Sequence, residues 1–175
     1  SSRDRIARKH GGLVLPQKPW KLDLPEIILF LGMGAAFSQY ANMLVGMLQS
    51  VLNYQEYQES MDQLMEGKQM WFLILSMGII APLAEEIVFR WLIYLRLRDY
   101  MRMGAAAVIS GLIFGIYHGN LVQAVYASLL GIVFAYILDI SGCLWSSVLL
   151  HMGANIWSLI SPDLYTWIIA RNPAA

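Results

Sequence analysis

The sequence predicts an all-α membrane protein, a bundle of about five to six transmembrane helices with a site in the bundle core. Of its 175 residues, 58% are hydrophobic and 14% are charged, against about 25% charged residues in soluble domains. The mean hydropathy is +0.53. The charged residues gather between long apolar runs, which is the pattern of a chain that crosses a bilayer several times.

Charge and chain ends limit the partners and the organisation. The formal net charge is zero, so no global positive field would attract nucleic acid. Residues 1–21 are basic and are expected to form a cytoplasmic flank. The chain starts with Ser1, which suggests a fragment whose upstream spans are missing. Residues 22–175 are expected to form one membrane-embedded domain, with its motifs in 69–160; the oligomeric state stays open.

The apolar runs define the spans in chain order. The first runs from Leu24 to about Leu52, and an acidic connecting helix at 53–68 is expected outside the cell. The second, 69–98, exceeds the roughly 20 residues that a span needs, so it must tilt, or bend at Pro82. Three further spans follow at 104–118, 120–140 and 144–160, and an apolar remainder at 163–170 is either a truncated sixth span or an interfacial piece.

Two further patterns orient and pack these spans. Arg96, Arg98 and Arg102 form a basic cluster that is expected on the cytoplasmic side. Small residues recur every four positions in the third and fourth spans, which lets neighbouring helices approach closely. These residues are Ala107, Gly111, Gly115 and Gly119, followed by Ala127, Gly131 and Ala135.

Polar and titratable groups inside the apolar spans are the main sign of function, because burying them in a bilayer is costly. They form three motifs: Glu85-Glu86-x-x-x-Arg90, Phe114-x-x-x-His118 and His151-x-x-x-Asn155. Residues four apart share a helix face, so Glu86 is expected to pair with Arg90, and His151 with Asn155. Glu85 would point about 100° away from Glu86 and stay free for other work.

The depth of the three motifs suggests that they converge. Counted from the expected cytoplasmic ends, Glu85, His118 and His151 lie about 16, 21 and 12 Å deep at 1.5 Å per residue. The hydrocarbon core is about 30 Å thick, so all three lie near mid-depth. One site built by three helices explains the cost better than three unrelated polar burials.

These side chains would suit water-mediated acyl hydrolysis. A buried carboxylate such as Glu85, next to His118, can hold a water molecule and accept its proton. His151 and Asn155 can donate hydrogen bonds to a tetrahedral oxyanion. The sequence has no serine elbow and no catalytic cysteine pattern.

Other readings stay open. Each motif alone is more often structural, either as a neutralised ion pair or as polar contact between helices. Glu85, His118 and His151 with a water molecule would also suit a zinc protease. A third possibility is a non-catalytic immunity or scaffold protein of the membrane.

The motifs, in this order and on separate apolar helices, resemble those of the CPBP family, the CAAX-processing proteases and bacteriocin-processing proteins, also called the Abi family. The resemblance covers about half of the chain. It implies an intramembrane endopeptidase that needs no metal or cofactor, in a helical bundle. In this resemblance Glu85 and His118 activate water, and His151 and Asn155 form the oxyanion hole. Glu86 and Arg90 support the site, and Phe114 walls it.

The resemblance also implies a class of substrate and a location. The substrate would be a membrane-associated or prenylated-type peptide or protein. The short loops favour a multi-pass protein of a prokaryotic cell membrane.

Overall fold

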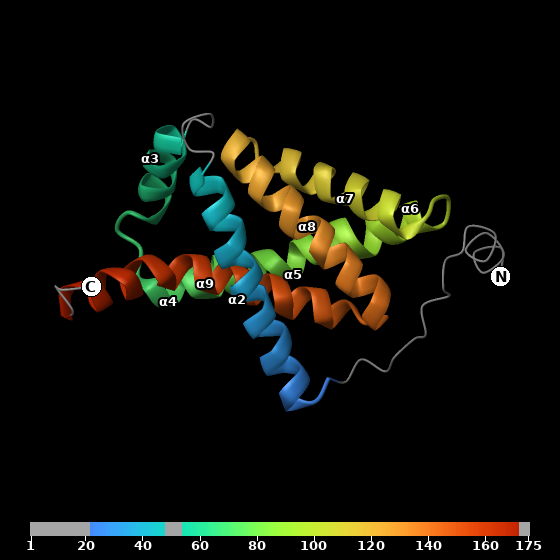
Figure 1. Ribbon diagram of the computed structural model, residues 1–175, viewed down its shortest axis with the longest axis horizontal. Coiled ribbons are helices and arrows are strands. Elements are labelled where there is room, and N and C mark those ends of the chain that lie inside the picture. The colour runs from blue at the N-terminus through green and yellow to red at the C-terminus, as the bar shows by residue number, and fades with distance from the viewer. Residues whose placement is uncertain (1–21, 48–53, 172–175) are drawn as a thin grey trace.

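The computed structural model describes residues 22–47 and 54–171, and the helices in these ranges form a bundle without strands (Figure 1). The predicted all-α bundle is therefore confirmed for the described part of the chain. The expected basic flank at 1–21 and the end of the first predicted span lie outside the described residues.

Except for the last one, the described helices agree with the predicted runs to within a few residues. One uninterrupted helical run from Met70 to Arg98 combines α-helical and π-helical segments. The elements are α2 (Leu24–Met47), α3 (Tyr54–Met65), α4 (Met70–Leu73), η1 (Ile74–Ile80), α5 (Ala81–Glu86), η2 (Ile87–Tyr94), α6 (Leu95–Arg98), α7 (Met103–Tyr117), α8 (Leu121–Ser141) and α9 (Leu144–Arg171).

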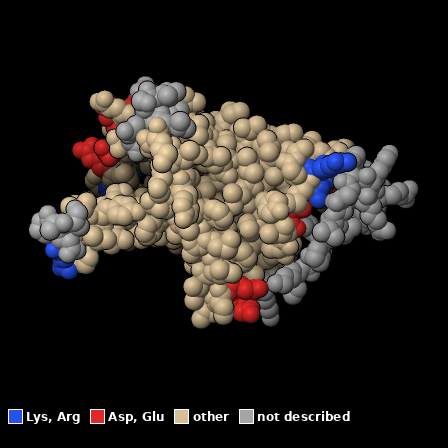
Figure 2. Space-filling view, viewed as in Figure 1, with Lys and Arg blue, Asp and Glu red and all other residues tan. Residues whose placement is uncertain are grey.

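Three of these helices are long and apolar enough to cross a bilayer: α2, the Met70–Arg98 run and α8. The apolar helix α7 is shorter, with 15 residues. Figure 2 shows a middle region almost free of charged side chains, with acidic groups over α3 and the start of α2 and basic groups near α6. This distribution is that of a membrane-embedded bundle with charged ends.

The expected break after the fifth span is wrong. Helix α9 continues from Leu144 to Arg171 and carries Pro162 in its interior. Proline removes one backbone N–H from the helical ladder, but neighbouring groups often compensate for this loss in membrane helices. The expected separate piece at 163–170 is therefore the last two turns of α9.

The Met70–Arg98 run has widened, π-helical turns on both sides of Pro82. The N–H of Ala81 bonds to the carbonyl of Ser76, five residues back, and the N–H of Leu95 bonds likewise to that of Arg90. Such π-helical turns are rare in proteins overall, and those that occur often lie at functional sites. They flank α5, so the segment that carries both glutamates lies between two widened turns.

The small residues of α7 and α8 pack the two helices together, as predicted. A Cβ atom on Gly111 would lie 2.9 Å from the backbone N of Ile132, and one on Gly115 would lie 2.4 Å from the carbonyl O of Ala124. Gly119 is the exception, because it lies in the turn after α7 with a φ of 77°. There a glycine is favoured by backbone conformation and not by helix contact.

A second close crossing, which the sequence did not suggest, joins α2 to α9 (Figure 1). A Cβ atom on Gly34 would lie 1.8 Å from the carbonyl O of Leu150, and one on Gly153 would lie 2.1 Å from that of Leu31. The backbones of the two helices therefore touch at both glycines, which fixes where α2 crosses α9.

Gly34→Ala is expected to destabilise the fold by about 1–3 kcal/mol, the usual cost of overpacking. Gly32→Ala is the matched control on the same helix, because nothing lies within 4 Å of its Cβ position. The control should be neutral or stabilising by up to about 1 kcal/mol. Unfolding free energies in detergent micelles measure both effects, and equal values would contradict the crossing.

Candidate active site

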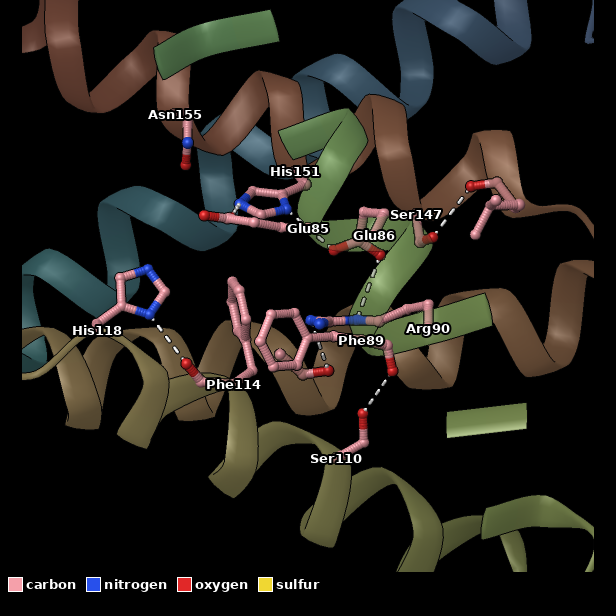
Figure 3. Close-up of polar contacts among 12 residues, drawn as sticks. Glu85, Glu86, Phe89, Arg90, Ser110, Phe114, His118, Ser147, His151 and Asn155 are labelled. Atoms are coloured by element: carbon pink, nitrogen blue, oxygen red, sulfur yellow. Dashed lines mark hydrogen bonds and ion pairs between the residues drawn. The ribbon is translucent and has the colours of Figure 1, made fainter. Parts of the chain in front are cut away.

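A buried ion pair lies at the centre of the site (Figure 3). Arg90 Nε lies 3.2 Å from Glu86 Oε2, and both side chains are fully buried. Arg90 also donates through Nη2 to the carbonyl of Gly131 at 3.2 Å. Its guanidinium lies 4.5 Å from the ring centroid of Phe114 and 5.2 Å from that of Phe134. The predicted Glu86–Arg90 pairing is confirmed, and α8 contributes to its surroundings.

His151 connects the two glutamates. Its Nδ1 lies 2.9 Å from Glu86 Oε1, and its Nε2 lies 3.5 Å from Glu85 Oε2. The ring stacks on Phe134 with centroids 4.6 Å apart. The sequence predicted that Glu85 would stay free. In the structure it faces His151 instead, and its side chain is 20% exposed.

The expected pairing of His151 with Asn155 is wrong. Asn155 donates through Nδ2 to the carbonyl of Met77 at 2.9 Å, in the π-helical segment η1. A carboxylate forms a stronger, charge-assisted bond to an imidazole than an amide does, and the glutamates of α5 lie within reach. Both side chains thus bind the Met70–Arg98 run, which ties α9 to α5 and η1.

His118 reaches the site from the end of α7. Its Nδ1 lies 2.9 Å from the carbonyl O of Phe114, and its ring meets the Phe114 ring edge-on at 4.9 Å. Phe114 also meets His151 edge-on at 5.6 Å, so this one buried ring contacts both histidines. In Figure 3, His118, Glu85 and Asn155 lie on one side of the Glu86–Arg90 pair.

The hydrogen bonds fix where the ring hydrogens of both histidines lie. A carbonyl only accepts hydrogen bonds, so His118 Nδ1 carries a hydrogen. An ion-paired carboxylate also only accepts, so His151 Nδ1 carries a hydrogen toward Glu86. In each neutral ring the other nitrogen, Nε2, therefore presents a lone pair. For His118 this nitrogen is a base, and for His151 it faces Glu85.

Several site residues were not singled out from the sequence. Phe134 stacks on His151, and Ser110 donates to the carbonyl of Phe89 at 3.0 Å, in η2. Gly131 was predicted only as a packing residue, yet its carbonyl accepts from Arg90. A buried serine or phenylalanine in an apolar helix carries no distinguishing pattern, so only Gly131 had a usable signal, its place in the small-residue stripe.

The zinc alternative gains no support from the geometry. Within 22–47 and 54–171, no three or more His, Cys, Asp or Glu side chains are grouped so that they could hold a metal ion. Glu85 and Glu86 instead lie on opposite ring nitrogens of His151.

Comparison with known families matches the part of the chain that builds this site. The profile described as "Type II CAAX prenyl endopeptidase Rce1-like" matches residues 67–157, a little more than half of the chain. The chain belongs to the Rce1-like family. The segment that matches this family includes Glu85, His118, His151 and Asn155, so the family resemblance and the polar cluster coincide.

One curated relative agrees with this assignment. The chain is 30% identical over 88 residues to "Putative membrane peptidase YdiL" of Bacillus subtilis (strain 168). The alignment covers 50% of this chain and 36% of the relative, so the chain spans little more than a third of that protein. No solved structure gives a significant match.

Proposed function

We propose that this Rce1-like chain is a membrane endopeptidase that hydrolyses a peptide bond with a water molecule activated by Glu85. The observation that carries the proposal is the contact of Glu85 with His151 Nε2, beside a fully buried Glu86–Arg90 pair. A partly exposed carboxylate held next to a fixed imidazole is a suitable acceptor for a water proton. Membership of the family supports the same reading.

In the proposed reaction, Glu85 takes a proton from water while the oxygen attacks the carbonyl carbon. His118 Nε2, with its lone pair, would help to orient that water. The C–O bond forms as the carbonyl oxygen becomes an oxyanion. The C–N bond then breaks, and the proton that Glu85 accepted, held on His151 Nε2 while the oxyanion exists, moves from there to the leaving amine.

Asn155 and His151 would stabilise the oxyanion. An amide group has two N–H donors; one N–H of Asn155 binds the carbonyl of Met77, and the other can face the substrate. His151 Nδ1 is bound to Glu86, so its Nε2 donates only once it has received a hydrogen. Glu85, at 3.5 Å, is placed to pass it the proton taken from water.

The remaining residues would keep this arrangement in place. Glu86 and Arg90 would hold His151 in position, and Phe114 would space the two histidine rings. Residues 22–175 would act as one protease domain in a prokaryotic cell membrane. The substrate would be a membrane-associated or prenylated-type peptide, a class to which the family description also points.

Asn155→Ala tests the oxyanion assignment. Removing one oxyanion donor typically lowers kcat by about 10²- to 10³-fold. We therefore expect such a loss in kcat, with KM nearly unchanged, for cleavage of membrane-anchored peptides in liposomes. Asn120→Ala is the control, because this asparagine caps α8 through Gln123. If wild type cleaves while Asn155→Ala keeps full kcat, the oxyanion assignment fails.

A further inference from the structure

A constant sequence offset aligns η2 and α6 with α8. Arg90 bonds to Gly131, and eight residues later Arg98 bonds to Asp139; each pair is 41 residues apart. In Figure 1 the helical run that contains η2 and α6, and the helix α8, both run from left to right along the chain. Between the two pairs, Tyr94 and Ala135 are fully buried in one hydrophobic cluster, again 41 residues apart. Because the offset stays equal over about two helical turns, sliding η2 and α6 along α8 would displace all three pairs together.

The Arg98–Asp139 pair uses most of the hydrogen-bonding groups of the guanidinium. Arg98 Nε lies 2.8 Å from Asp139 Oδ1, and Nη2 lies 3.4 Å from Oδ2. Nη1 donates to the carbonyl of Met101 at 3.0 Å, in the turn after α6. Both side chains are more than 90% buried. Arg98, which the sequence grouped with Arg96 and Arg102 in a basic cluster, is thus neutralised inside the bundle.

Arg90, at the other end, has little room to adjust. A Cβ atom on Gly131 would lie 3.1 Å from Arg90 Nη2 and 3.0 Å from Phe114. The guanidinium therefore fits against a bare backbone, and its position depends on where η2 lies along α8. Through Glu86, that position also determines where the ring of His151 lies.

We infer that Arg98 and Asp139 are positioning residues, which set the register of η2 against α8 and so place Arg90, Glu86 and His151. For its catalytic consequence this inference rests on the proposed function. The pair touches no reacting group; it acts through the helix register. A bidentate ion pair suits this task better than apolar contacts, because its geometry is directional.

The first arm of the test is kinetic. Asp139→Asn and Arg98→Lys each weaken the pair, and each should lower kcat about ten- to hundredfold, because small misplacements of reacting groups have such effects. KM should stay within about twofold. The matched control is Arg96→Gln, since the side chain of Arg96 is 73% exposed, although its partner Asp99 is only 12% exposed. The reversed pair, Arg98→Asp with Asp139→Arg, should recover at least tenfold over Arg98→Asp alone.

The second arm does not depend on activity. The chain has three histidines, so ¹⁵N-histidine labelling of the full chain in micelles gives few ring signals. The His151 signals, assigned by comparison with His151→Asn, should shift in Asp139→Asn and stay in place in Arg96→Gln. If the His151 signals do not shift in Asp139→Asn, the inference is overturned, whether or not kcat falls. If they shift while wild type cleaves nothing, the positioning inference stands and the proposed function fails.

Discussion

Glu85→Gln is expected to reduce peptide cleavage by about 10²- to 10⁴-fold, the usual contribution of a general base. Glutamine has nearly the same shape and can still contact His151 Nε2, but it cannot accept the water proton. Because the side chain of Glu85 keeps some exposure and forms no ion pair with an arginine of the described ranges, the substitution to a neutral side chain of the same shape should leave folding largely intact. Product formation and the unfolding temperature, measured on the same micelle preparation, check both parts.

Glu66→Gln is the matched control for this prediction. Glu66 is an exposed carboxylate just after α3, and its loss removes the same charge without touching the site. Its cleavage rate should equal that of wild type. Undiminished cleavage by Glu85→Gln would mean that another group activates the water, and the assignment of Glu85 would have to be abandoned.

Arg90→Met is expected to cost about 3–5 kcal/mol of stability, because it leaves the buried carboxylate of Glu86 without its cation. Arg90 is fully buried, contacts two aromatic rings and donates to Gly131. The change therefore removes an ion pair, a hydrogen bond and ring contacts at once. Unfolding in micelles by denaturant titration measures the loss.

A double variant separates charge from packing. Glu86→Gln combined with Arg90→Met removes both charges, and replacement of a whole buried pair is often nearly neutral for stability. The double variant should therefore be more stable than Arg90→Met alone, while activity stays low because His151 has lost its carboxylate partner. If the double variant is less stable than the single one, the Arg90–Glu86 pair is not what stabilises this part of the bundle.

Hydropathy and helical periodicity predicted most of the helices, because the length of an apolar run and the spacing of its small residues are both properties of a single helix. The Met70–Arg98 run, α7 and α8 lie where the sequence placed them, and Gly111 and Gly115 pack as expected. The continuation of α9 through Pro162 was missed, because a proline breaks helices in water more readily than among packed membrane helices.

The clustering of the three motifs was predictable from the sequence, and their contacts were not. The depths of the motifs suggested convergence, and Figure 3 shows the three motifs in one cluster. The partners of His151 and Asn155 lie on another helix, and residue spacing within one helix says nothing about such contacts. Asp139 was overlooked for the same reason, since its partner Arg98 lies on another helix and was grouped with Arg96 and Arg102.

The most direct test of the central claim is the cleavage rate of a membrane-anchored peptide by purified wild type, before and after treatment with a strong chelator. A glutamate-activated water needs no metal, so the rate should be unchanged by the chelator and should fall to background in Glu85→Gln. Loss of wild-type activity on chelation, with recovery on adding zinc, would contradict the account and turn Glu85, His118 and His151 into candidate metal ligands.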